Sequence, residues 1–209
     1  MRVACAGGGP AGLFLALLLH RQGGHEVVVY DRNPPGADAG FGVVFSRLGL
    51  ARLRGIAPDV VDALLARGAS WSDLHVRAGA DRVTVANHDY AAVGRTALLT
   101  CLREAAERAG ARLVPGTEVT AAELLGEHDL VVAADGAGSR IRAGLAAELG
   151  TRVEPSSTRY AWFGADRAFP AMTFLFTRTE HGWVSAHVYP YAAGRSTFLV
   201  EIGPEVWRR

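Results

Sequence analysis

The first twelve residues, MRVACAGGGPAG, place a short apolar run before three glycines at G-x-G-x-x-G spacing, Gly7, Gly9 and Gly12, and this arrangement predicts the fold of the first unit. The apolar run predicts a buried strand over residues 3–6, and the residues after the turn predict a helix over 11–22. Two glycines end that helix, and residues 26–30 predict a second strand. In this context of strand, turn, helix and strand, the spacing indicates a phosphate-binding βαβ unit.

Each position of the turn has a physical role in binding a dinucleotide. Gly7 allows a tight turn, Gly9 lets a pyrophosphate approach bare backbone at the helix start, and Gly12 lets the helix pack closely on the strand. Asp31 ends the second strand, nineteen residues after Gly12, where a carboxylate accepts hydrogen bonds from an adenosine ribose. The alternative is that the glycines only shape a turn and that Asp31 is a solvated charge. The unit by itself does not distinguish NAD from FAD.

The composition is that of an ordinary soluble globular protein, with 209 residues, 49% of them hydrophobic, and a formal net charge of +1. That charge gives no basic excess for nucleic acid, and the seven-residue apolar run at 13–19 is too short to span a membrane. Arg2 and the apolar segment after it are typical of a secretory signal, but glycines and Pro10 interrupt the segment, which continues into a predicted strand. Cys5 and Cys101 lie in apolar surroundings and predict buried thiols in a reducing compartment, so we expect a cytoplasmic location.

The residue types also exclude some chemistry. All 22 basic residues are arginine, which excludes a lysine Schiff base and a P-loop lysine. None of the seven histidines lies in a metal-like cluster with cysteines or acids, so no metal is expected. The sequence shows no Ser-His-Asp arrangement.

Two further stretches favour FAD. Residues 130–133 predict an apolar strand that leads into Asp135-Gly136, with Ser139 near the start of the next helix, and Arg95 opens a helix that continues to about residue 109. An acid-glycine pair after a strand lies at the carboxyl edge of the sheet, where ligands bind. Together with the glycine turn, these stretches make the chain resemble the FAD-dependent aromatic hydroxylases, the flavoprotein monooxygenases of the p-hydroxybenzoate hydroxylase type.

The resemblance implies an α/β fold, in which a Rossmann-like FAD-binding βαβ domain carries an antiparallel β-sheet substrate domain. It also implies FAD as cofactor and NAD(P)H as co-substrate. Reduced nicotinamide would pass a hydride to FAD, and O₂ would form a C4a-hydroperoxide that hydroxylates a small aromatic substrate. No residue can be identified as catalytic from the sequence. The candidate cofactor-binding residues are Gly7, Gly9, Pro10, Ala11, Gly12, Asp31, Arg32, Arg95, Val119, Asp135 and Gly136.

Four more segments narrow the resemblance, and they occur in the same order as in the family: residues 41–46, 159–164, 180–189 and 196–201. They resemble the subgroup that contains salicylyl-CoA 5-hydroxylase, anthraniloyl-CoA monooxygenase and the violacein-pathway hydroxylases. That subgroup implies an aryl-CoA thioester or an indole-like metabolite as substrate.

The second half of the chain predicts a different layer. Short strands over 173–177, 183–189 and 196–201 predict an antiparallel meander, joined by a hairpin over residues 74–76 and 82–86. Alternation places Ser185, His187 and Tyr189 on one face, so they are candidate substrate residues, although His187 alone is more typical of a structural histidine. The aromatic residues of this layer are expected to lie mostly in the core: Trp162, Phe163, Phe174, Phe176, Trp183 and Phe198.

These patterns predict a domain organisation in four segments. Residues 1–70 form the βαβ unit with the loop and helices after it, and residues 71–93 form a hairpin of the substrate sheet. Residues 94–157 complete the FAD-binding domain, and residues 158–209 form the meander.

Members of the resembled family continue into a Gly-Asp segment that contacts the ribityl and pyrophosphate groups of the flavin, and no such stretch occurs up to Arg209. We therefore expect only the first of the family's two FAD-binding regions in these residues. We also expect a homo-oligomer or a complementing partner chain to cover the incomplete sheet. Three hypotheses follow: a truncated or split FAD monooxygenase, a non-catalytic nucleotide- or substrate-binding remnant, and an NAD-dependent dehydrogenase. Asp135-Gly136 and the aromatic meander argue against the dehydrogenase.

Overall fold

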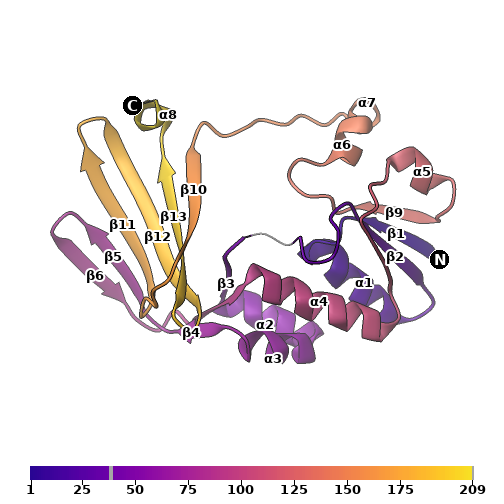
Figure 1. The fold of residues 1–209 in the computed structure, drawn as a ribbon, viewed down its shortest axis with the longest axis horizontal. Coiled ribbons are helices and arrows are strands. Elements are labelled where there is room, and N and C mark those ends of the chain that lie inside the picture. Colours follow the sequence, from indigo (N-terminus) through magenta and orange to yellow (C-terminus); the bar gives the residue numbers. More distant parts are fainter. Residues whose placement is uncertain (38–39, 209) are drawn as a thin grey trace. The chain divides into compact units, whose positions relative to one another are not determined.

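A computed structural model describes residues 1–37 and 40–208 of the chain. The chain divides into two compact units (Figure 1), each built from two separated segments. Unit 1 comprises Met1–Asp38 with Leu99–Glu154, and unit 2 comprises Ala39–Leu98 with Pro155–Arg209. Within the described part of the chain, no helix is both long and apolar enough to cross a membrane.

Unit 1 is built on a parallel sheet that confirms the predicted βαβ unit. Its order is β8-β2-β1-β9, and all three pairings are parallel. Val3, Ala4 and Cys5 on the central strand are 0% exposed, because a parallel sheet of this kind is covered on both faces. The strands are β1 (Arg2–Ala6), β2 (Glu26–Asp31), β8 (Arg112–Pro115) and β9 (Leu130–Ala133).

The helices that the sequence predicts in unit 1 begin within one residue of the predicted positions, whereas two short helices, over residues 121–125 and 146–149, were not predicted. Pro10 begins α1 (Pro10–Gln22), and the backbone N–H of Gly23 closes it by donating to the carbonyl oxygens of Leu19 and His20. Ser139 caps the first turn of α6 by accepting from the Arg142 N–H at 3.0 Å. The others are α5 (Ala121–Leu125), α6 (Arg140–Gly144), α7 (Ala146–Leu149) and α4 (Arg95–Ala109), whose first four residues count with unit 2.

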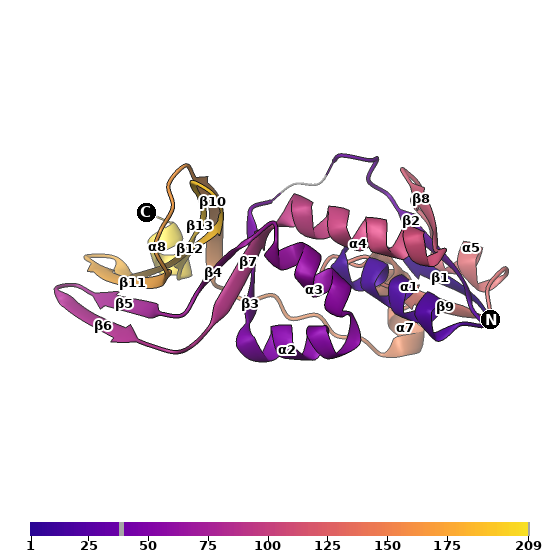
Figure 2. The ribbon, with the colours of Figure 1, turned by 90° about the horizontal axis from the view of Figure 1, so that it is seen from below.

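Unit 2 holds the predicted antiparallel meander within a six-stranded sheet of order β10-β13-β12-β11-β5-β6. The predicted hairpin joins this sheet, because β5 pairs with β11 in parallel, and Figure 2 shows the hairpin alongside β11. All other pairings in the sheet are antiparallel. The strands are β5 (Leu74–Ala78), β6 (Asp81–Val85), β10 (Arg159–Ala165), β11 (Met172–Thr179), β12 (Gly182–Ala192) and β13 (Arg195–Ile202).

A three-stranded antiparallel sheet, which was not predicted from the sequence, completes unit 2. It comprises β3 (Gly42–Ser46), β7 (Tyr90–Gly94) and β4 (Ala69–Trp71). A shared core joins it to one end of the larger sheet, with Trp71, Tyr189 and Tyr191 among the buried residues. The helices of this unit are α2 (Arg47–Ile56), α3 (Pro58–Leu65) and α8 (Pro204–Trp207), together with the start of α4.

The expectation that the aromatic residues of the meander lie mostly in the core is wrong for three of them. Trp183 is 60% exposed, Phe163 is 52% exposed and Phe176 is 38% exposed. Strand alternation sends side chains to both faces of a sheet, whereas only part of each face is covered by other described residues. The other three, Trp162, Phe174 and Phe198, are half-buried.

Candidate functional site

The glycine turn connects the carboxyl end of β1 to α1, and its shape requires glycine at two of the three predicted positions. Gly7 has φ +118°, and a Cβ there would overlap the carbonyl group of Ala134. A Cβ on Gly12 would overlap the carbonyl oxygen of Gly7, so the helix can pack this closely on the turn only because residue 12 is glycine. The N–H of Gly7 donates to the carbonyl oxygen of Tyr30 at 2.7 Å, which ties the turn to β2.

Gly9 differs from its neighbours, because a Cβ on it would meet no atom within 4 Å. Its backbone is extended, with φ −75° and ψ 179°, and no side chain caps the helix that starts after it. The first amides of α1 therefore have no side-chain acceptor among the described residues, and open space lies beside the Gly9 backbone. A helix start of this kind, next to bare backbone, fits the pyrophosphate of a dinucleotide.

Asp31 lies beside the turn at the end of β2, as predicted. Its Oδ1 accepts from the backbone N–H of Asn33 at 3.0 Å, and its Oδ2 faces Gly8, where a Cβ would come within 2.5 Å of it. Gly8 is therefore a candidate site residue that the G-x-G-x-x-G spacing does not identify, because it occupies a variable position of that pattern. The third consecutive glycine was the signal that could have identified it.

A pocket of about 340 Å³ lies next to Asp31 within unit 1. Arg103 and Glu107 contribute charged groups from α4, and the remaining lining is largely apolar. Asp31 is among the lining residues, and its carboxylate suits ribose hydroxyls, so this corner of unit 1 fits an adenosine group. The lining residues are Gly8, Leu13, Val29, Asp31, Asn33, Pro34, Pro35, Arg103, Glu107, Leu113, Val114 and Pro115.

Asp135 and Gly136 follow β9, and the backbone of Asp135 lies against the glycine turn, because a Cβ on Gly7 would be 2.8 Å from its nitrogen. Oδ2 of Asp135 accepts from the N–H groups of Arg140 and Ile141, at 2.8 and 3.3 Å. Burial acts to raise the pKa of Asp135, but hydrogen bonds from Ser139 and from these amides outweigh it, so the pKa lies below its ordinary value. Its Oδ1 is buried and has no partner among the described residues.

The remaining cofactor candidates have different environments. Arg32 is exposed directly after Asp31, and Val119 packs against a core cluster of unit 1. Pro10 and Ala11 form the first turn of α1, and Gly136 has φ +90° with open space around it. These placements are compatible with contact to a nucleotide, and the contacts themselves stay predictions.

Arg95 is the first residue of α4, as predicted, and counts with unit 2. Its backbone N–H donates to the carbonyl oxygen of Phe41 at 2.7 Å. A Cβ on Gly40 would lie 2.7 Å from Cδ of Arg95 and 2.9 Å from the Trp162 ring, so only glycine fits between these side chains. Gly40 was not predicted as a site residue, although the glycines on both sides of Phe41 were a signal. The contact of Arg95 with a pyrophosphate stays a prediction.

The three candidate substrate residues differ in exposure. Tyr189 is 5% exposed, and its hydroxyl donates to the carbonyl oxygen of Gly42 at 2.7 Å, so it belongs to the core of unit 2. Burial raises the pKa of Tyr189, and a hydrogen bond with Thr197 only partly opposes it. His187 stacks on Tyr189 with ring centroids 6.1 Å apart, and both His187 and Ser185 are half-buried. His187 and Ser185 are thus the members of the set that remain accessible.

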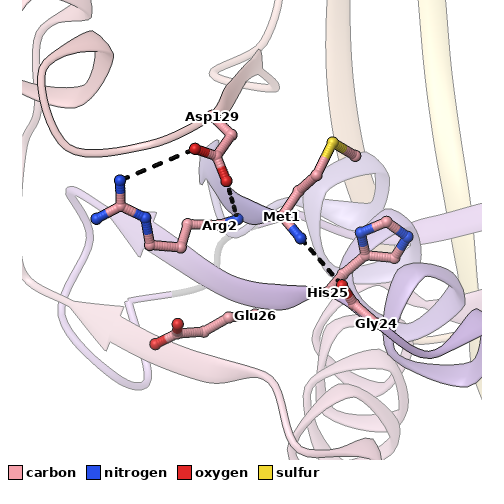
Figure 3. Close-up of a pocket in the computed structure, with 6 residues that line it drawn as sticks. All are labelled: Met1, Arg2, Gly24, His25, Glu26 and Asp129. Carbon is pink, nitrogen blue, oxygen red and sulfur yellow. Dashed lines mark hydrogen bonds and ion pairs between the residues drawn. The ribbon is translucent and has the colours of Figure 1, made fainter.

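A second, open pocket of about 420 Å³ lies at the amino ends of β1 and β2, and Figure 3 shows its six residues. The ammonium group of Met1 donates to the carbonyl oxygen of Gly24 at 3.0 Å, and the Arg2 N–H donates to Asp129 at 2.7 Å (Figure 3). That backbone hydrogen bond is the main reason that the pKa of Asp129 is lowered. These contacts hold strand ends together at the opposite end of β1 from the glycine turn.

Comparison with known proteins places these features in context. The sequence profile of the family described as "FAD binding domain" matches residues 1–205. A salicyloyl-CoA 5-hydroxylase from a Streptomyces species is 40% identical over all of this chain, which covers 41% of that protein. A 3-hydroxy-4-methyl-anthranilyl-[aryl-carrier protein] 5-monooxygenase from Streptosporangium sibiricum is 40% identical over 96% of the chain, which covers 57% of that protein. The chain thus spans about half the length of these two relatives.

The fold also matches solved structures. The structure of P. aeruginosa PqsL in complex with 2-aminobenzoylacetate has a TM-score of 0.79 at 20% identity, over 100% of this chain and 62% of that one. The p-nitrophenol 4-monooxygenase PnpA from Pseudomonas putida DLL-E4 has a TM-score of 0.77 at 18% identity, over 99% of this chain and 60% of that one. At these identities the likeness establishes the fold.

Proposed function

The chain belongs to the FAD binding domain family, and we propose that it is the FAD-binding and substrate-facing part of an aromatic monooxygenase that uses NAD(P)H and O₂. The observation that carries the proposal is the turn between β1 and α1. There the open space at Gly9, the uncapped start of α1 and the Asp31 carboxylate beside Gly8 lie within one corner of unit 1. This arrangement supplies amides for a pyrophosphate and an acceptor for ribose hydroxyls.

The residues fit FAD, whose flavin would supply hydride acceptance and oxygen activation when bound. In the proposal the amides of Ala11 and Gly12 bind the pyrophosphate, and Asp31 accepts hydrogen bonds from the ribose. Asp135 holds the start of α6 and keeps the backbone at Gly136 in place next to the turn. The chain's part in catalysis is then to bind, to orient and to exclude water.

We propose an aromatic acyl thioester as the substrate class. Two relatives at 40% identity are named for the 5-hydroxylation of salicyloyl-CoA and the 5-monooxygenation of an anthranilyl group on an aryl-carrier protein. Both named substrates present an aromatic ring with a carbonyl thioester, and both carry it on a phosphopantetheine arm. The half-buried rings of Trp162, Phe174 and His187 offer an aromatic surface for such a ring.

Binding of FAD tests the proposal through the substitution Gly9→Ala. The structure has room for this methyl group, and the backbone of Gly9 is extended, so the melting temperature without FAD should change by only a few degrees. Affinity for FAD, measured by quenching of flavin fluorescence, should fall by at least about tenfold, because the methyl group fills the space of the pyrophosphate. The matched control is Gly55→Ala, a glycine in α2 that also has open space around it. If Gly9→Ala and wild type bind FAD equally, the proposal is wrong.

Turnover is a separate measurement from FAD binding. Substrate-stimulated oxidation of NAD(P)H by the flavin-loaded chain would establish activity in this polypeptide. A chain that binds FAD without turnover would favour the alternative of a nucleotide-binding part that needs a second copy or a complementing chain. Sedimentation with and without FAD would identify a homo-oligomer.

A further inference from the structure

One face of the six-stranded sheet in unit 2 carries a set of aromatic side chains in register. Trp162 on β10, His187 on β12 and Phe174 on β11 lie in one cross-strand row, because Leu199 links the pairs Trp162–Leu199 and His187–Leu199. The next row outward holds Tyr160, Ser185 and Phe176. Directly opposite residues share a face of an antiparallel sheet, so these rows form one surface.

This surface is covered at its inner end and open at its outer end. At the inner end Tyr189 is buried and stacks with Trp71, at a centroid distance of 6.2 Å. Two rows further out, Tyr160 is 67% exposed, Phe176 is 38% exposed and Trp183, in the row beyond, is 60% exposed. Large aromatic groups exposed together on one sheet face are typical of a surface that contacts a ligand or partner.

The outer end of this surface carries a cation. Arg178 lies directly opposite Trp183 in the β11–β12 pair, and it is exposed. No ion pair or hydrogen bond among the described residues engages its guanidinium. Glu201 and Asp81 also lie on this face, each two strands away from β11, which is roughly 10 Å at ordinary strand spacing. Because these carboxylates would repel an anion and Arg178 would attract it, an anion at the outer end is expected to bind on β11, next to Arg178.

We infer that the outer part of this face on β11 and β12, formed by Phe176, Arg178 and Trp183, binds the phosphopantetheine arm of an aromatic coenzyme A thioester. His187 and Trp183 are four residues apart on β12, so the two rows are separated by roughly 13 Å along the strand. A ring at the His187 row would thus send its extended arm along β12 and β11, past Phe176 and Trp183, and the arm's phosphate would reach Arg178. Glu201 on β13 lies directly opposite Ser185, so the arm would keep to the β11 side of β12. Arginine suits this role because its planar guanidinium pairs with phosphate oxygens in two parallel hydrogen bonds.

The surface favours coenzyme A over a carrier protein as the source of the arm. Among the strand residues that the structure describes at the outer end of this face, Arg178 is the one arginine, and it lies beside Trp183, where it can pair with one phosphate group of the arm. Docking of an acidic carrier protein would engage several cations over a wider patch. The inference rests on the proposed aromatic thioester substrate, and it adds the residues that hold the non-reacting part of that substrate.

Binding of benzoyl-CoA and benzoyl-pantetheine to the 209-residue chain, measured by calorimetry, tests the inference. Arg178→Ala should weaken benzoyl-CoA on the order of tenfold, as expected for the loss of one charge-assisted contact, and should leave benzoyl-pantetheine unchanged. Trp183→Ala should weaken both ligands. The matched controls, Arg159→Ala and Phe163→Ala, change exposed residues on the opposite face of the same sheet and should change neither affinity.

Several outcomes would overturn the assignment. One is equal binding of benzoyl-CoA by wild type and Arg178→Ala, and another is an equal loss in Arg159→Ala. A third is a benzoyl-phosphopantetheinyl carrier protein that binds more than tenfold more tightly than benzoyl-CoA. FAD affinity, measured on the same samples, separates this inference from the proposed function: a chain that binds FAD but not benzoyl-CoA contradicts the inference alone. A chain that binds benzoyl-CoA but not FAD contradicts the proposed cofactor role alone.

Discussion

Asp31 and Asp135 both lie at the carboxyl edge of the parallel sheet, but their carboxylate oxygens have different hydrogen-bond partners. Asp31 keeps Oδ2 beside the bare backbone of Gly8, where a ligand hydroxyl could reach it. Asp135 has Oδ2 bonded to two amides of α6. At the scale of the residue, therefore, one acid is available to a nucleotide through its side chain, whereas the other orders the backbone next to it.

The cap that Asp135 forms predicts a pH-dependent effect of its removal. Asp135→Ala should lower the free energy of unfolding by about 1 kcal/mol at neutral pH, as is typical for a lost helix-cap acceptor. The pKa of Asp135 is lowered in the folded state, so its contribution is present above the ordinary aspartate pKa and is lost as pH falls through the folded value. Urea unfolding at pH 7 and pH 3 checks this, since the difference between variant and wild type should shrink at pH 3. A difference that is equal at both pH values would contradict the charged cap.

At the scale of the element, the shape of the glycine turn depends on the contact between β1, α1 and the segment after β9, which we call the joint. The carbonyl group of Ala134 occupies the space where a Cβ of Gly7 would lie, and the carbonyl oxygen of Gly7 occupies the corresponding space at Gly12. Hydrogen bonds from Gly7 to Tyr30 and from Ala134 to Ala6 hold the same joint. Strand, turn and helix therefore support one another, and no single one sets the shape of the turn.

The joint predicts two different costs for alanine at glycines of positive φ. Gly136→Ala has open space and should cost about 1 kcal/mol, from the left-handed backbone alone. Gly7→Ala also overlaps the carbonyl group of Ala134, so its cost should exceed that of Gly136→Ala by about 2 kcal/mol or more. Thermal unfolding of the two variants side by side measures the difference. Equal costs would mean that the segment after β9 moves away freely from the turn.

At the scale of the whole molecule, the chain carries separate reporters for its two units. Both cysteines, Cys5 and Cys101, lie in unit 1, and all four tryptophans lie in unit 2. Burial raises the pKa of the Cys5 thiol to about 11, and the side chain is 0% exposed. The thiolate needed for reaction is therefore scarce at pH 8 in the folded state.

These reporters predict how FAD acts on the molecule. In urea, FAD should raise the midpoint for thiol exposure, followed with a thiol-specific dye, more than the midpoint for tryptophan fluorescence. The reason is that the proposed FAD contacts with Gly9 and Asp31 lie in unit 1, which holds both thiols. Gly9→Ala is the control, because its thiol midpoint should respond less to the same concentration of FAD. If FAD shifts both midpoints equally in wild type, the ligand stabilises the two units together.

Much of the fold was predictable from local pattern. The apolar run before Gly7, the helix that starts at Pro10 and the strand that ends at Asp31 are all set by residues close together in the sequence. The same holds for the meander, whose strands alternate and are separated by turn residues. Propensity, capping and periodicity act over a few residues, so a single sequence reports them directly.

Tertiary structure alone decided what depends on partners distant in the sequence. Gly8 proves to be a close-approach position only because Asp31 lies against it, and Tyr189 proves to be a core residue only because β3 brings the Gly42 carbonyl to its hydroxyl. Trp183 and Phe176 have the same alternating pattern as buried residues, yet they are exposed, because no described element covers that part of the sheet. Local sequence indicated the βαβ unit, the meander and the positions that we predict to bind a nucleotide, but not the three-stranded sheet of β3, β7 and β4. Burial and contact depend on how segments far apart in the chain pack together, and only the folded structure contains that information.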